Sequence, residues 1–201
     1  MPPNLTPLSL AFAGGAVYAL SAIFSKRALE TGAGTFRSLV WSNWAITVAF
    51  IPFPLLAGES ISRAAVLPGI FLGCIFFFAQ TACFMALRRG DASLVTSIMG
   101  SKSLFVAFSL VLLGFRDSLP TKTWIAAILA AVAVALLCWP AKGMKPSMAS
   151  LLLASFTAAA FGLTDALVPH YAQSANPLNL LFIMIFTVGV LSFAIIPFVR
   201  G

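Results

Sequence analysis

The sequence predicts an all-α membrane protein, a polytopic bundle of about seven transmembrane helices. Of its 201 residues, 61% are hydrophobic and only 8% are charged, whereas a water-soluble domain has about 45–50% apolar and about 25% charged residues. The few charges also stand between long uncharged stretches, and stretches of about 18 or more such residues are typical of membrane-spanning helices. These two observations exclude a soluble globular fold.

Seven segments have the length of a membrane-spanning helix. Each is close to the ~20 residues that cross a hydrocarbon core of ~30 Å. Only helices fit, because the apolar runs are long and do not alternate with polar residues. The expected spans are 8–25, 38–57, 66–87, 92–114, 123–140, 149–169 and 178–199.

The first three spans have recognisable beginnings and ends. No Lys or Arg precedes the first apolar run and further spans follow it, so we interpret it as a helix and not as a cleaved signal peptide. The second opens with Trp41 and Trp44, which are expected to anchor at the membrane interface, with an inward-facing Trp44 as the alternative. The third is followed by Gly90 and contains Gly69 and Gly73, a small-residue pair that favours helix packing.

The last four spans follow with short connections, so consecutive helices are expected to pack as antiparallel neighbours. The fourth contains a single charge, Lys102, and the fifth lies between Trp124 and Trp139. These two tryptophans fit an aromatic belt at both interfaces. Asn176 and Pro177 separate the sixth span from the seventh.

The charged residues point to lipid as a partner. The net charge of +7 comes from cations dispersed at the ends of the spans, where they contact headgroups. Nucleic acid is excluded as a partner, because nucleic-acid binding needs clustered cations. The three cysteines lie inside apolar stretches without metal-ligand spacing, so we predict no metal and no cofactor.

Charge bias also gives an orientation. With the N-terminus outside, the inner side carries Lys26, Arg27, Arg37, Arg88, Arg89, Lys142, Lys145 and Arg200, and the outer side carries Arg63, Arg116 and Lys122. Short cytoplasmic loops are enriched in Lys and Arg, so this count favours an outside N-terminus.

The first two spans resemble the last two. At an offset of 143 residues, Ala11, Gly15 and Ala19 correspond to Ala154, Ala158 and Gly162. A repeat of five helices places its second copy in the opposite sense across the membrane, as in many secondary transporters. The alternative is a chance match, because small residues are common where membrane helices approach each other.

Three stretches, 86–95 (ALRRGDASLV), 101–108 (SKSLFVAF) and 112–119 (LLGFRDSL), together resemble the EamA repeat of the drug/metabolite transporter superfamily. The resemblance implies a complete five-helix repeat over 8–140 and two helices of a second, inverted repeat over 149–199. It also implies a multi-pass carrier of small metabolites in the inner or plasma membrane, often coupled to a proton or another ion, with a cytoplasmic N-terminus. That orientation conflicts with the charge bias.

Two features depart from the family pattern. Gly114 is followed by Phe115 where the family usually has Glu. The sequence ends at Gly201, three helices short of the family's usual ten, which leaves open a fragment of a longer protein or an oligomer of identical chains.

Lys102 is the first candidate site residue. An ammonium near the middle of a span costs at least ~2.5–3.5 kcal/mol on insertion scales, and its neighbours on the same helix cannot pair with it. Asp165 is the only acid well inside another span, about 6 Å deeper along its helix, a distance that an extended lysine can bridge. We expect either a substrate or proton site, with Lys102 attracting an anionic group, or a structural ion pair.

Gln80, Asn43 and Tyr18 are further substrate-binding candidates, because they are polar groups at depth in their spans. Such groups more often form hydrogen bonds between helices.

The favoured function is a secondary active, alternating-access transporter of small metabolites or drugs with a midplane site. The alternatives are a truncated or non-transporting scaffold and, ranked lower, a seven-helix receptor. No catalytic motif is present, so an enzyme is not expected.

Overall fold

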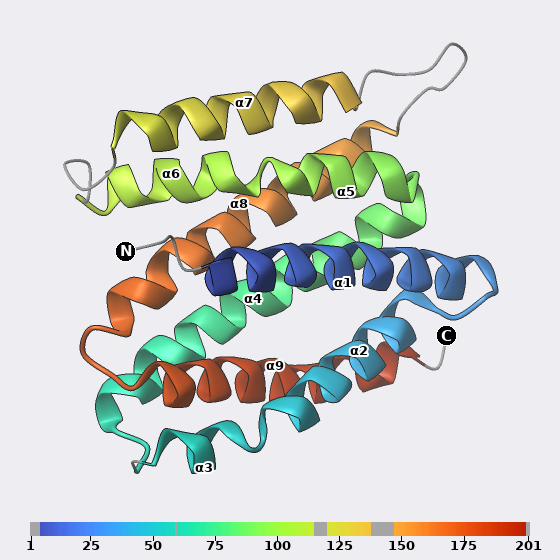
Figure 1. The fold of residues 1–201 in the computed structure, drawn as a ribbon. Coiled ribbons are helices and arrows are strands. Elements are labelled where there is room, and N and C mark those ends of the chain that lie inside the picture. The colour runs from blue at the N-terminus through green and yellow to red at the C-terminus, as the bar shows by residue number, and fades with distance from the viewer. Residues whose placement is uncertain (1–4, 59, 115–119, 138–146, 200–201) are drawn as a thin grey trace.

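The computed structural model describes residues 5–58, 60–114, 120–137 and 147–199, and every regular element among them is a helix. The helices shown in Figure 1 are α1 (Leu5–Glu30), α2 (Thr35–Phe50), α3 (Phe53–Ala57), α4 (Arg63–Arg89), α5 (Ala92–Gly100), α6 (Lys102–Leu112), α7 (Thr121–Leu137), α8 (Met148–Tyr171) and α9 (Pro177–Val199). The all-α fold class is therefore confirmed.

Several of these helices are long and apolar enough to cross a membrane. Within the described residues the qualifying segments are Thr35–Leu56, Arg63–Arg89, Ala92–Leu112, Met148–Tyr171 and Pro177–Pro197. They correspond to the second, third, fourth, sixth and seventh expected spans. The first expected span is α1, and the fifth corresponds to a shorter apolar helix, Thr121–Val134. Residues 138–140, which we assigned to the end of the fifth span, lie outside the described residues.

Two of the expected spans are interrupted. The second breaks between α2 and α3 at Ile51 and Pro52, because proline lacks the N–H that would continue the helix and its ring clashes with the preceding turn. The fourth breaks between α5 and α6 at Ser101. Each interrupted pair still forms one apolar crossing, so the expected number of spans is unaffected.

Helix α4 lies at the centre of the bundle (Figure 1), where it packs against α8 and α9. Helix α2 lies along α9, while α5 and α6 lie along α8 and are covered in turn by α7. Helix α1 crosses in front of α4 and makes smaller contacts with α2, α4 and α5. Residues of α1 line two cavities beside these helices.

Glycines set the closest helix contacts. A Cβ at Gly73 would lie 2.6 Å from the Met184 carbonyl oxygen, and one at Gly69 would lie 2.7 Å from Ile183 Cγ2. Real Cβ atoms do not approach so closely, so α4 and α9 pack as they do because these positions have no side chain. The packing role expected for this pair is confirmed.

The two rows of small residues that match at the 143-residue offset differ in their burial. In α8, Ala154 and Ala158 are fully buried. In α1, Gly15 and Ala19 are exposed and line a cavity. The inverted second repeat that the sequence match suggested stays a prediction.

Hydrogen bonds join the C-terminal end of α1 to α4. The Lys26 ammonium donates hydrogen bonds to the carbonyl oxygens of Leu87 and Gly90, both at 2.9 Å, and lies 3.7 Å from the Glu30 carboxylate. A cation is well placed there, because the last carbonyls of a helix have no partner within the helix and carry partial negative charge. Helix α1 is thus held at this end.

Candidate functional site

Lys102 is the first residue of α6, directly after the break in the fourth span. Helix α5 ends at Gly100, the Ser101 hydroxyl donates to the Ile98 carbonyl at 2.6 Å, and the Leu104 N–H donates to the Ser101 carbonyl at 2.9 Å. Glycine costs backbone entropy in a helix, and the serine hydroxyl competes for backbone carbonyls. The helix therefore tightens into a single 3₁₀-like turn, an arrangement that often marks functional sites.

Asp165 reaches Lys102 because α8 passes very close to this turn. A Cβ at Gly162 would lie 2.6 Å from Phe105 Cβ and 3.0 Å from the Lys102 carbonyl oxygen, so only glycine permits the approach. Asp165 follows three residues later, on the same face of α8. Lys102 Nζ and Asp165 Oδ2 are 2.7 Å apart, which confirms the pair that we expected from the sequence.

The ion pair is not sealed in the core. The side chains of Lys102 and Asp165 are 41% and 48% exposed, and both line a cavity of about 320 Å³. A half-exposed ion can exchange its partner for another charged group, whereas separating a fully buried pair leaves an uncompensated charge in the core. The geometry therefore suits a pair that a ligand can reach.

Four of the five candidate residues meet at this cavity, which we call the polar cavity. Tyr18 of α1 and Gln80 of α4 line it together with Lys102 and Asp165. Its lining also includes three hydroxyl groups, from Ser21, Ser25 and Ser42. Together these side chains offer one cation, one anion and several neutral hydrogen-bonding groups.

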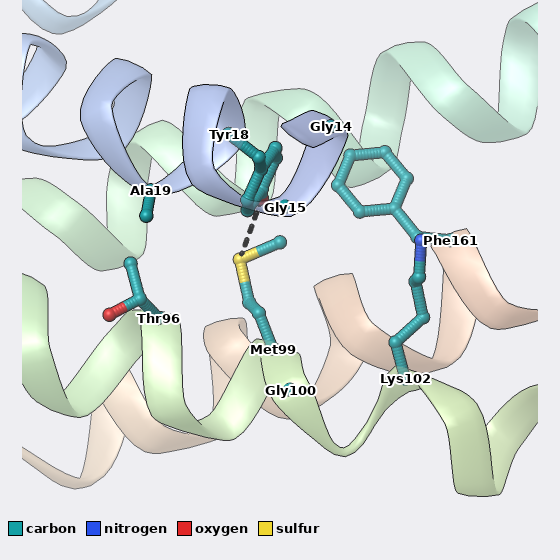
Figure 2. Close-up of a pocket in the computed structure, with 9 residues that line it drawn as sticks. All are labelled: Gly14, Gly15, Tyr18, Ala19, Thr96, Met99, Gly100, Lys102 and Phe161. Atoms are coloured by element: carbon teal, nitrogen blue, oxygen red, sulfur yellow. Dashed lines mark hydrogen bonds between the residues drawn. The ribbon is translucent and has the colours of Figure 1, made fainter. Parts of the chain in front are cut away.

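A second and larger cavity, of about 570 Å³, lies between α1, α5, α6 and α8 (Figure 2). Apart from Lys102, it is lined mainly by glycine, alanine, methionine and phenylalanine, and we call it the apolar cavity. Three residues line both cavities: Tyr18, Lys102 and Phe161. The Tyr18 hydroxyl donates to Met99 Sδ at 3.4 Å, which links α1 to α5.

Asn43, the fifth candidate, lies apart from both cavities. It is fully buried, and its Nδ2 donates to the Ser192 hydroxyl oxygen at 3.0 Å, between α2 and α9. Ser192 in turn donates to the Val188 carbonyl at 2.8 Å. This is the alternative role that we weighed for such residues, a hydrogen bond between helices.

Asn43→Ala is accordingly expected to weaken the bundle without affecting ligand binding. Removal of one interhelical hydrogen bond costs about 0.6–1.7 kcal/mol in membrane proteins. Stability is measured by titrating the purified protein with SDS and following its helical circular dichroism. A loss of transport as large as that of a Lys102 variant would contradict this assignment.

Sequence reasoning missed the serines. Tyr18, Ser21 and Ser25 are spaced by three and four residues, which places them on one face of α1, and all three line the polar cavity. Their spacing could have identified that face. Phe161 could not be identified as a cavity residue from the sequence, because it is one of 19 phenylalanines in an apolar sequence.

The arrangement is suited to binding. Lys102 can donate up to three hydrogen bonds, and the carboxylate and hydroxyls can accept them. Within the described residues, no group of three or more His, Cys, Asp or Glu side chains is placed to hold a metal ion.

Long apolar helices, with a Lys–Asp pair beside a cavity between them, support a multi-pass membrane protein. Residues 5–139 match the model of the EamA-like transporter family. Since the match covers more than half of the chain, the chain belongs to this family, and the resemblance noted from the sequence is confirmed. No curated protein and no solved structure matches the chain.

Family membership sets the general function. The protein is a membrane transporter of the drug/metabolite transporter type. The members of this family are transporters, which fits the expectation that the chain is not an enzyme. Its long apolar helices agree with a multi-pass location in a membrane.

Proposed function

We propose that the protein carries a small organic anion across the membrane by alternating access, with Lys102 as the principal ligand-binding residue. The observation that carries this proposal is the half-exposed Lys102–Asp165 pair, 2.7 Å apart beside an internal cavity. Intramembrane ionisable residues are rare and mark substrate and ion pathways. Transporter sites also form typically at interrupted helices, and Lys102 directly follows such an interruption.

Asp165 has a distinct role in this proposal. It neutralises Lys102 when the site is empty, so the apo protein carries no net charge at the pair. A bound anion adds one negative charge at the pair, and an unbalanced charge inside the membrane is unfavourable. A proton that crosses together with the anion would cancel this charge, so we propose a proton as the coupling ion.

The test is uptake into proteoliposomes that contain the purified full chain. A panel of radiolabelled small carboxylates and sulfonates is offered with and without an inward proton gradient. We expect saturable uptake of at least one anion, stimulated by the gradient and absent from protein-free liposomes. Uptake confined to cations or to neutral sugars would rule out the anion carrier.

A further inference from the structure

We propose that the substrate is an amphipathic anion whose charged group binds Lys102 and whose compact apolar group occupies the apolar cavity. This inference rests on the proposed function, since it takes Lys102 as the anion site. It adds a second subsite, formed by α1, α5 and α8, that selects for the apolar part of the molecule.

The first step is that the two cavities meet at the lysine. Lys102 lines both of them, whereas Asp165 lines only the polar cavity. An anion that enters from the apolar cavity therefore reaches the ammonium without passing the carboxylate. Because the ammonium has three donor hydrogens, it can hold a ligand oxygen while it still contacts Asp165.

The second step concerns the chemistry of the two linings. The apolar cavity is bounded by Gly14, Gly15 and Ala19 of α1 and by Met99 of α5, with Thr96 its one polar side chain besides Tyr18 and Lys102. The polar cavity presents three serines, Gln80 and Asp165 beside apolar side chains that include Phe76 and Leu87. The flexible side chain of Met99 can adapt to apolar groups of different shapes. Lys102 thus lies between a cavity lined mainly by small and apolar residues and a cavity that adds hydroxyl, amide and carboxylate groups.

The third step is the space available. At about 570 Å³, the apolar cavity lies within the ~300–1,000 Å³ typical of small-molecule sites. A Cβ at Gly14 or at Gly15 would meet no heavy atom within 4 Å, so these glycines are not required for helix packing as Gly162 is. Figure 2 shows both glycines among the residues that line this cavity, where a larger side chain would take up part of the space.

Gly15→Leu should therefore fill the subsite without disturbing the fold. The probes are methanesulfonate, benzenesulfonate and naphthalene-1-sulfonate, which share a permanently ionised group and differ in apolar size. Lysine acts as a point charge with little preference for planar acceptors, so a sulfonate is a suitable head group. Binding to the full chain in lipid nanodiscs is measured by isothermal titration calorimetry, with titrations of empty nanodiscs subtracted.

For the wild type we expect affinity to rise by about tenfold or more from methanesulfonate to naphthalene-1-sulfonate, because each larger probe buries more apolar surface. Gly15→Leu should remove this gain while changing the affinity for methanesulfonate by less than about twofold. The matched control is Ala16→Leu, which adds the same bulk to α1 at a residue that lines neither cavity and should leave all three affinities unchanged.

Two results would overturn the proposal: naphthalene-1-sulfonate binding the wild type no more tightly than methanesulfonate, or Gly15→Leu leaving its affinity unchanged. The proposed function is tested separately by Lys102→Met, which should weaken all three probes. If Lys102→Met weakens them and Gly15→Leu does not discriminate among them, the anion site stands and the apolar subsite fails. If Lys102→Met has no effect, the anion site fails and this proposal fails with it.

Discussion

Replacement of Lys102 by methionine is expected to reduce anion transport by roughly 10- to 100-fold, since a hydrogen bond to a charged group contributes about 1.5–3 kcal/mol. Methionine keeps most of the length of the side chain and removes only the charge and its donors. The measurement is the initial rate of uptake into proteoliposomes over a range of substrate concentrations. Because Asp165 is half-exposed, the protein should stay folded, with a cost below the ~2.5–3.5 kcal/mol assigned to an acid at a helix centre.

Two further variants separate a transport role from a structural one. Lys122→Met removes an exposed lysine at the start of α7 and should leave the rate unchanged. The double variant Lys102→Met with Asp165→Asn removes both charges, so it should recover any stability lost in the single variant. If the double variant regained transport together with stability, the pair would have only a structural role in packing.

The charged pair was predictable because the cost of a charge inside the membrane is large. Only Lys102 and Asp165 carry formal charges well inside the apolar spans, and neither could pair on its own helix. The 2.7 Å contact between them follows from this requirement and from the depth of the two residues in the membrane. Because so few charged residues lie inside the spans, Lys102 and Asp165 were the one pair of opposite charges that could meet there.

The polar cavity was predictable only in part. Gln80 and Tyr18 were identified by polarity and depth, and both line it. The same criterion selected Asn43, which instead bonds to Ser192. Depth in a span gives distance along the membrane normal, whereas the direction of a side chain around its helix depends on packing. In such uniformly apolar helices, the sequence carries little information about that direction.

The amino-acid composition around Ser101 did not predict the break in the helix. Gly100 and Ser101 occur within a run that is apolar on both sides, and isolated glycines are tolerated in membrane helices. The position of Asp165 beside Lys102 depends in turn on the close approach of α8 at Gly162, which is a contact between segments about 60 residues apart. No local pattern records such a contact.

That contact gives the second large effect: Gly162→Ala should both destabilise the protein and impair transport. The added methyl group would lie 2.6 Å from Phe105 Cβ and 3.0 Å from the backbone oxygen of Lys102. Neither atom is the end of a flexible side chain, so α8 must move away from α6. Overpacking of this kind costs about 1–3 kcal/mol, and the movement would also separate Asp165 from Lys102.

The expected result is a lower SDS midpoint for unfolding, together with a reduced transport rate at temperatures where the variant is still folded. Gly15→Ala is the matched control for stability, because the same methyl group there meets no heavy atom within 4 Å. Removing a helix glycine without a clash should be neutral or stabilise by up to about 1 kcal/mol. Equal midpoints for the two variants would mean that α8 does not need to approach α6 so closely. Full transport by a folded Gly162→Ala protein would mean that the position of Asp165 beside Lys102 does not limit the rate.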